Sequence, residues 1–178
     1  MCGSVFSFQS WVLLNRKSPN VRAYEFLDRP ATCCIHFVTA REFDVAQKHK
    51  VDEAIRRGVK YVYWDYLDGG GTSTTIADPL GRTLQLEHAP YGGRGGLSPW
   101  LRFLDDLITL SYRYPGLVIV VDHADSLLRE NSDEMFDLVE AFLTQFHHWY
   151  DQKKPCHLCF QMVRNDSVRR VFFGGTDD

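Results

Sequence analysis

The segment Leu117–Asp122 (LVIVVD) constrains the fold more than any other part of the chain. Five consecutive apolar residues, three of them valine, are followed by an aspartate. Strands with one solvated face alternate apolar and polar residues, whereas strands buried on both faces are continuously apolar. Strands of this second kind belong to parallel sheets that helices cover on both sides. The segment therefore predicts an α/β fold with Leu117–Val121 as a buried strand.

Other segments fit the same fold class. We expect one α/β domain over residues 1–178, with a mixed, largely parallel central sheet flanked by helices and with peripheral β-hairpins. Pro99 after Ser98 predicts the start of one helix, and Asn131 with Glu134 is a capping pair for another. The expected strands are 4–13, 21–27, 32–39, 59–66, 117–121, 156–163 and 168–173, with a hairpin over 74–88 and helices over 44–57, 99–112 and 131–150.

The five cysteines indicate neither a disulfide framework nor a zinc site. Cys156 and Cys159 have the C-x-x-C spacing, but they lie in an apolar strand-like run. On a strand these two side chains point to opposite faces, so we expect buried, reduced thiols. Reduced thiols fit the cytosol. No apolar run reaches the roughly 18 residues of a membrane span, so we expect a cytoplasmic protein with no membrane partner.

Charge is distributed unevenly along the chain. The formal net charge is −3, which argues against a nucleic-acid binder. Residues 101–151 alone hold 10 acidic and 3 basic residues, a net charge of 3 − 10 = −7. In the last helix Asp133, Asp137 and Glu140 line one face at spacings of four and three. Like charges at these spacings repel, so a basic partner is one explanation and a solvated helix face is the other.

Enzyme motifs are absent. The chain has no G-x-S-x-G, H-E-x-x-H or G-x-G-x-x-G, so we expect no catalytic activity. Leu117–Leu128 (LVIVVDHADSLL) resembles the Walker B strand of P-loop ATPases. The phosphate-binding loop that should follow strand 32–39 is replaced by residues 40–44 (AREFD), whose two acids repel phosphate. A degenerate P-loop-like regulatory or scaffold domain without NTPase activity is therefore the alternative function.

Acidic residues also follow two of the predicted strands. Asp65 and Asp68 end the segment 59–66, and Asp122 and Asp125 follow the strand 117–121. Ligands of parallel sheets bind at the carboxyl ends of the strands, where four carboxylates could hold a divalent cation. Capping of the following helices is the simpler explanation, and we expect no metal and no cofactor.

The carboxyl-terminal half resembles barstar, the intracellular ribonuclease inhibitor. The resemblance runs through Tyr91-Gly92, a helix with Asp105-Asp106, the segment 114–119 (YPGLVI), an acidic helix over 134–146 and the strand 157–162. It covers residues 91–163, and residues 1–90 have no counterpart in that family. In the barstar family the tyrosine–glycine loop and the acidic helix after it plug the nuclease active site. The resemblance thus assigns partner binding to Tyr91, Gly92, Asp105, Asp106, Glu134 and Asp137, to which the helix spacing adds Asp133 and Glu140.

Charge and resemblance predict the same kind of protein. Nucleases present cationic side chains to the phosphates of their substrate, and an inhibitor can mimic these phosphates with carboxylates. We expect a cytoplasmic immunity protein that binds and occludes a cognate toxin with a basic cleft, and a nuclease is the expected class of toxin. The sequence leaves the oligomeric state open.

Overall fold

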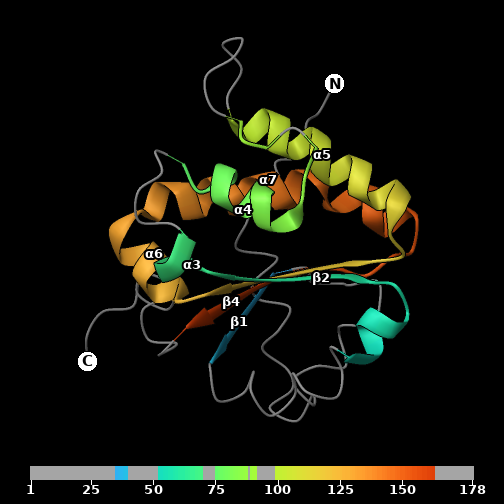
Figure 1. Ribbon diagram of the computed structural model, residues 1–178, viewed down its shortest axis with the longest axis horizontal. Helices are drawn as coiled ribbons and strands as arrows, with labels where there is room; N and C mark the ends of the chain where they lie inside the picture. The colour runs from blue at the N-terminus through green and yellow to red at the C-terminus, as the bar shows by residue number, and fades with distance from the viewer. Residues whose placement is uncertain (1–34, 40–51, 70–74, 88, 92–98, 163–178) are drawn as a thin grey trace, which may run out of the picture.

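Four parallel strands form the centre of the molecule. A computed structural model describes residues 35–39, 52–69, 75–87, 89–91 and 99–162 (Figure 1). The sheet has the order β1-β4-β3-β2, and every neighbouring pair is parallel. The strands are β1 (Ile35–Thr39), β2 (Lys60–Asp65), β3 (Leu117–Asp122) and β4 (Cys156–Met162), and the helices are α3 (Tyr66–Gly69), α4 (Ala77–Leu84), α5 (Pro99–Arg113), α6 (Ala124–Glu130) and α7 (Ser132–Asp151). The predicted α/β class with a largely parallel sheet is confirmed.

Strands β3 and β4 lie inside the sheet and are buried along their whole length. This agrees with the continuous apolar runs that predicted them, since a strand covered on both faces has no position for an exposed polar side chain. The predicted strands 59–66 and 156–163 match β2 and β4 to within a residue at each end. The described part of strand 32–39 is β1.

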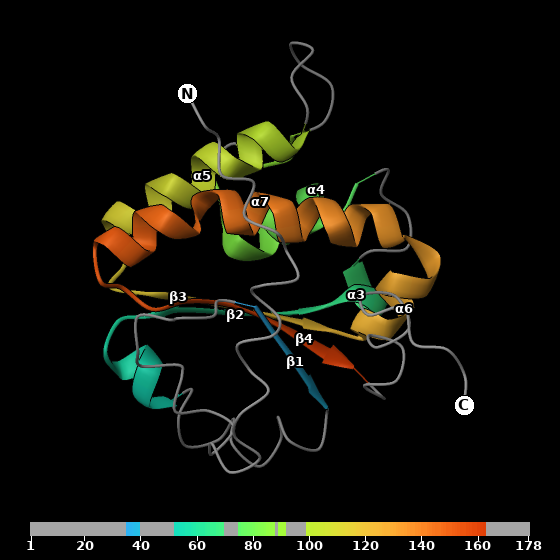
Figure 2. The ribbon, with the colours of Figure 1, turned by 180° about the vertical axis from the view of Figure 1, so that it is seen from behind.

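The two faces of the sheet carry different cores. Helices α4, α5 and α7 cover one face (Figures 1 and 2), where the larger cluster of buried side chains lies. A smaller cluster on the other face joins Val38, Val120 and Cys159 to Ala54 of the helical residues 52–56. Cys156 belongs to the larger cluster and Cys159 to the smaller one, so the two buried thiols point to opposite faces, as predicted. Among the described residues, no helix has the length and apolar character needed to cross a membrane.

The predicted hairpin over 74–88 is wrong, because Ala77–Leu84 in the middle of this range form helix α4. Pro79-Leu80-Gly81 suggested a turn, but proline is tolerated in the first turn of a helix. Ile76, Leu80 and Leu84 are almost completely buried at helical spacing, and their burial against α5 and the sheet outweighs the turn preference. The described residues contain no β-hairpin. The predicted strands 4–13, 21–27 and 168–173 lie outside them.

Helix α7 buries only part of the apolar side chains that share one helical spacing. Phe136 and Tyr150 have the spacing of Val139 and Phe146, but they are 39% and 52% exposed. Val139 and Phe146 are buried. The sequence of α7 contains two overlapping apolar stripes, and packing against α5 and β4 selects one of them. The stripe that is buried comprises Met135, Leu138, Val139, Ala141, Phe142, Gln145, Phe146 and Trp149.

Gly81 allows α4 to approach the ring of Tyr91. A Cβ atom at Gly81 would lie 2.7 Å from Cε2 of Tyr91 and 2.9 Å from its hydroxyl oxygen. Since this ring is buried and packs edge-on against Phe103, it has no room to move away. The close contact between α4 and Tyr91 thus depends on the absence of a side chain at position 81.

We predict that Gly81→Ala destabilises the protein by about 1–3 kcal/mol, the usual cost of overpacking a core. On helix propensity alone the same change would stabilise α4 by about 1 kcal/mol, so the two effects have opposite signs. Urea denaturation measures the free energy of unfolding. The control is Thr83→Ala at an exposed position of the same helix, which should change stability by less than about 0.5 kcal/mol. A stabilising Gly81→Ala would contradict the account.

Candidate functional site

Two of the predicted toxin-binding residues, Tyr91 and Asp106, lie in the interior. They are only 1% and 3% exposed, and the Tyr91 hydroxyl donates a hydrogen bond of 2.9 Å to Oδ2 of Asp106. The backbone N–H of Tyr91 donates to Oδ1 of Asp78 at 2.6 Å. Burial, followed by the hydrogen bond and charge of Asp106, raises the pKa of Tyr91. The partner-binding role that the resemblance assigns to Asp106 requires an exposed side chain, whereas the structure buries it. The buried hydroxyl of Tyr91 is a hydrogen-bond partner for the carboxylate of Asp106. The Tyr91–Asp106 pair therefore joins α5 to the segment after α4.

Glu134 is also used internally. Its Oε2 accepts hydrogen bonds from the Thr75 hydroxyl at 2.7 Å and from the Ile76 backbone N–H at 2.9 Å. It therefore ties the start of α7 to the residues that lead into α4. The predicted capping pair with Asn131 is not formed, because the side chain of Asn131 makes no capping hydrogen bond. The Glu134 carboxylate instead accepts hydrogen bonds from the Thr75 hydroxyl and the Ile76 N–H, which are the donors near α4.

The remaining predicted acids are exposed. Asp105 points outward from α5, and Asp133, Asp137 and Glu140 point outward from α7. Gly92 lies outside the described residues. Together with Phe136, the three exposed acids of α7 form a surface that we call the α7 acidic face. Partial burial, then the charges of Glu134, Glu140 and Asp133, raise the pKa of Asp137. No described Lys, Arg or His forms an ion pair with these three acids.

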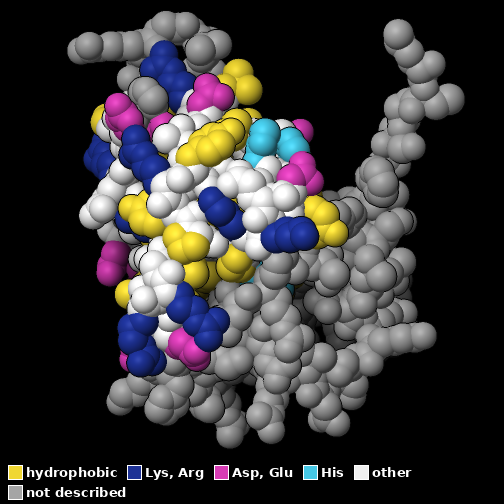
Figure 3. Space-filling model, turned by 90° about the vertical axis from the view of Figure 1, so that its right-hand side faces the viewer, with side chains coloured by type: hydrophobic (Ala, Val, Ile, Leu, Met, Phe, Trp, Pro, Cys, Tyr) yellow, Lys and Arg dark blue, Asp and Glu magenta, His cyan; other side chains and the backbone are white. Residues whose placement is uncertain are grey.

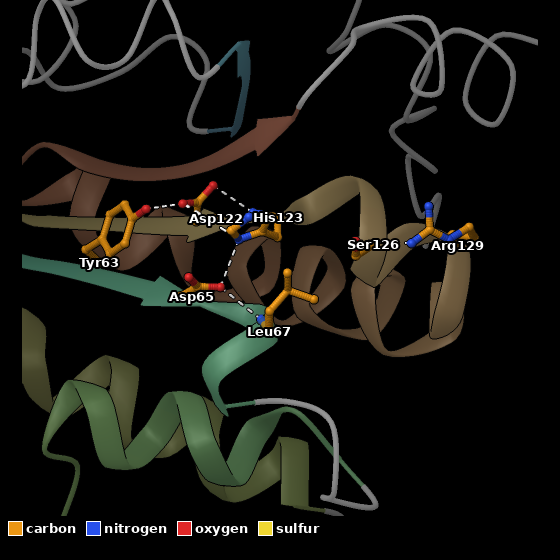
Figure 4. A network of polar contacts seen from close by, with 7 residues as sticks. All are labelled: Tyr63, Asp65, Leu67, Asp122, His123, Ser126 and Arg129. Carbon is orange, nitrogen blue, oxygen red and sulfur yellow. Dashed lines mark hydrogen bonds and ion pairs between the residues drawn. The ribbon is translucent and has the colours of Figure 1, made fainter.

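A second group of polar side chains lies at the carboxyl ends of β2 and β3. Asp65 and Asp122 are directly opposite each other in the parallel register. His123 follows Asp122 and has a positive φ of 53°, so that its ring lies between the two carboxylates (Figure 4). Nδ1 of His123 is 2.9 Å from Oδ1 of Asp65 and 3.8 Å from Oδ2 of Asp122. We call this group the carboxyl-edge cluster.

Hydrogen bonds from neighbouring groups hold both carboxylates in place. The hydroxyl of Tyr63 donates to Oδ2 of Asp122, whose Oδ1 accepts the backbone N–H of His123 at 2.7 Å. The backbone N–H of Leu67 donates to Oδ1 of Asp65 at 2.9 Å. Partial burial, then the bond to Asp122, raises the pKa of Tyr63 and keeps its proton available as a donor. These hydrogen bonds limit the orientations that the two carboxylates can take.

Sequence reasoning found Asp65 and Asp122 but missed His123 and Tyr63. Tyr63 stands two residues before Asp65, so strand alternation places both on one face. That periodicity could have found it, whereas the left-handed backbone of His123 has no sequence signal. The predicted capping role is fulfilled by Asp65, which accepts the N–H of Leu67 in α3. It is not fulfilled by Asp125, whose Oδ1 is buried without a partner in the described structure.

Basic side chains gather at the opposite end of the sheet. Figure 3 shows Lys and Arg spread among hydrophobic side chains over the side of the molecule that lies to the right in Figure 1. At the amino ends of the strands, Lys60 opens β2, Arg113 ends α5, and Lys153 and Lys154 precede β4. Acidic side chains lie among them, as in the ion pair of Arg113 with Glu87, whereas Asp65, Asp122 and Asp125 lie at the carboxyl ends.

Comparisons with known proteins give no family for the chain. No known protein family and no curated protein matches it. A solved structure of Drosophila ORC bound to DNA has a TM-score of 0.48 and 12% identity over 84% of this chain and 37% of that one. A Walker-type ATPase of Pyrococcus abyssi has a TM-score of 0.42 and 15% identity over 80% of this chain and 44% of that one. The chain thus spans less than half the length of either structure, and likeness at this level does not establish a shared function.

We predict that Tyr91→Phe lowers the free energy of unfolding by about 1–3 kcal/mol, because the buried Asp106 carboxylate loses one hydrogen-bond donor. Urea denaturation measures the change. Tyr112→Phe is the matched control, since Tyr112 is 73% exposed and the same substitution there should cost less than about 0.5 kcal/mol. Equal effects of the two substitutions would show that the Tyr91–Asp106 bond does not support the fold.

The carboxyl-edge cluster sets the titration of His123. Partial burial lowers the pKa of His123, but the hydrogen bond to Asp65 and the charges of Asp122, Asp65 and Asp125 outweigh it, so the net shift is upward. A histidine whose pKa is raised on folding stabilises the fold below its unfolded pKa of about 6.5, and this contribution is lost as the pH rises through the folded pKa.

We therefore predict that Asp65→Asn lowers the pKa of His123, as followed by NMR titration of its ring, and that the stability lost in this variant is larger at pH 5 than at pH 8. Asp68→Asn is the control, because Asp68 is exposed and does not contribute to the upward shift. An unchanged His123 pKa in Asp65→Asn would mean that the cluster is not formed in solution.

Proposed function

We propose that the chain is a non-catalytic immunity protein that binds and occludes a cognate toxin through the α7 acidic face. The observation that carries the proposal is the row of exposed carboxylates Asp133, Asp137 and Glu140, which no described cation neutralises. Like charges at helical spacings cost a few tenths of a kcal/mol per pair. A basic partner would turn this cost into a favourable interaction.

An aromatic side chain lies at the edge of the α7 acidic face. Phe136 is 39% exposed and stands three residues after Asp133 and four before Glu140, so it neighbours both acids on the helix surface. Interfaces are typically built from aromatic anchors that become fully buried, surrounded by polar and charged groups that remain partly solvated. Phe136 therefore supplies burial on binding, while the carboxylates steer the partner and fix its orientation.

Asp105 extends the proposed surface to α5, which packs against α7. The buried residues Tyr91 and Asp106 and the half-buried Glu134 do not touch the partner in this scheme. Their hydrogen bonds to one another and to the segment around α4 hold α5 and α7 in position instead. The resemblance to barstar thus supports the kind of partner and the use of an acidic helix. The residues proposed to contact the partner lie mainly on α7, and Tyr91 and Asp106 are not among them.

The cognate toxin would present Lys, Arg or His in a cleft that normally receives phosphate, so a nuclease is the proposed target class. Inhibition is steric and electrostatic and uses no cofactor. A cytoplasmic location belongs to this proposal. It fits Cys156 and Cys159, which are buried on opposite faces of the sheet and are not joined to each other by a disulfide.

A degenerate P-loop-like regulatory domain is the second candidate, because Asp122 ends the central strand β3 beside Asp65 in an all-parallel sheet. This candidate predicts that ATP or GTP with Mg²⁺ binds the isolated chain and that Asp122→Asn abolishes the heat of binding in calorimetry. The immunity proposal predicts no nucleotide binding and no effect of nucleotide on toxin inhibition.

The product of the adjacent gene is the first partner to test. We predict that it is toxic when expressed alone, that co-expression of this chain restores growth, and that Asp137→Lys with Glu140→Lys weakens the complex at least about tenfold by replacing attraction with repulsion. Calorimetry or surface plasmon resonance measures the affinity. The α7 substitutions are preferred over Asp106→Lys, which would place a charge in the interior.

Asp52→Lys with Asp151→Lys is the matched control, since both residues are exposed and lie off the α7 acidic face, and the net charge changes by the same amount. It should bind within about threefold of the natural chain, because charges beyond the roughly 8–10 Å screening length contribute little. If both double variants weakened binding equally, the effect would come from the net charge of the chain and not from a specific surface on α7. A non-toxic or non-binding gene product would exclude the proposed pair.

A further inference from the structure

We propose that the carboxyl-edge cluster binds one divalent first-row transition-metal ion through Asp65, Asp122 and His123. The donor atoms are two carboxylate oxygens and one imidazole nitrogen, which come from two neighbouring strand ends and lie within 4.8 Å of one another. This site is built from different residues than the α7 acidic face, so it stands or falls independently of the proposed toxin binding.

The spacing of the donors fits a shared ion. Ligand atoms about 2.0–2.1 Å from a metal are separated by about 3.0 Å in octahedral and about 3.4 Å in tetrahedral geometry. Nδ1 of His123 lies 2.9 Å from Asp65 Oδ1 and 3.8 Å from Asp122 Oδ2, so the observed separations bracket these values. Small rotations of the side chains would be sufficient to place all three on one triangular face of a coordination shell.

The kind of metal follows from the donors. Mg²⁺ and Ca²⁺ prefer shells made only of oxygen, whereas Zn²⁺, Co²⁺, Mn²⁺ and related ions accept imidazole together with carboxylate. A nitrogen donor placed between two carboxylates therefore favours a transition ion. Without the metal, Nδ1 of His123 donates its proton to Asp65, and coordination would move this proton to Nε2 or to solvent.

Groups around the cluster support the ligands as they do in known metal sites, where hydrogen bonds orient each ligand. Tyr63 and the backbone of His123 hold Asp122, and the N–H of Leu67 holds Asp65 (Figure 4). The N–H of Leu67 and Nδ1 of His123 both bond to Oδ1 of Asp65. Oδ2 of Asp65 has no partner among the described residues, so it remains available to bind a metal.

Charge and exposure also suit a metal ion. The carboxylates of Asp122, Asp65 and Asp125 all act on His123, and no described lysine or arginine is bonded to any of the three. A dication would neutralise this excess of negative charge. The side chains of His123 and Asp65 are 37% and 26% exposed, so an ion can enter from solvent and keep water on its open positions.

Titration of the full chain with Co²⁺, followed by its visible absorption, tests the proposal. We expect saturation at one ion per chain, displacement by Zn²⁺, and no displacement by a similar concentration of Mg²⁺. Asp65→Asn and His123→Asn should each weaken Co²⁺ binding at least about tenfold. Asparagine tolerates the left-handed backbone of residue 123, so the second variant keeps the local fold.

Asp68→Asn and His147→Asn are the controls. Asp68 is an exposed acid on α3. The exposed His147 and the half-buried His148 lie side by side near the end of α7, with ring centroids 4.0 Å apart, and such a pair could hold an ion by chance. Both controls should bind Co²⁺ like the natural chain. Loss of binding in His147→Asn with retention in His123→Asn would overturn the proposal, as would the absence of any Co²⁺ binding or equal affinity for Mg²⁺.

A measurement on the natural chain covers the case in which a cluster variant does not fold. Substoichiometric Mn²⁺ should broaden the NMR signals of the His123 ring and of Tyr63 before those of His147 and His148. Broadening that begins at His147 and His148 would place the ion elsewhere and contradict the assignment.

Discussion

Burial of β3 and β4 on both faces is the constraint on which the rest of the structure depends. Two adjacent parallel strands without a single exposed position can be stable only if helices or other segments cover both sides of the sheet. Helices α5 and α7 provide that cover on one face, and their own outer sides become the surface of the molecule. The exposed polar side chains discussed above therefore lie at the strand ends and on the outward faces of these helices.

This restriction separates the acidic residues into three kinds. Asp106 and Glu134 bond to groups inside the fold and hold helices together. Asp65 and Asp122 meet at the carboxyl edge, where the parallel register places them opposite each other around His123. Asp133, Asp137 and Glu140 stay exposed without described ion-pair partners. The acidic residues therefore fall into three groups: those that hold helices together, those that meet at the carboxyl edge, and those that are exposed on α7. Only the exposed acids on α7 can steer a partner.

Strand positions could be predicted because continuous apolar runs such as Leu117–Val121 have few alternatives. Helix α4 could not, since Pro79 and Gly81 suit both a turn and a first helical turn, and tertiary burial of Leu80 and Leu84 decides between them. The same limit applies to α7, where Phe136 and Met135 belong to overlapping apolar stripes and packing selects Met135. The acidic residues of the candidate sites could be named from the sequence. Which of them are bonded inside the fold and which stay exposed could not be predicted, because contacts between segments distant in sequence bring the partners Tyr91, Thr75 and His123 to them.

The central claim is that exposed carboxylates on α7 attract and orient a basic partner. The association rate of the complex as a function of ionic strength tests it most directly, because surface charges act over about 10 Å at 0.1 M salt and over about 3 Å at 1 M. The account predicts a rate constant that falls at least about tenfold between 0.05 and 0.5 M salt, while the dissociation rate changes much less. An association rate that does not depend on salt would contradict it.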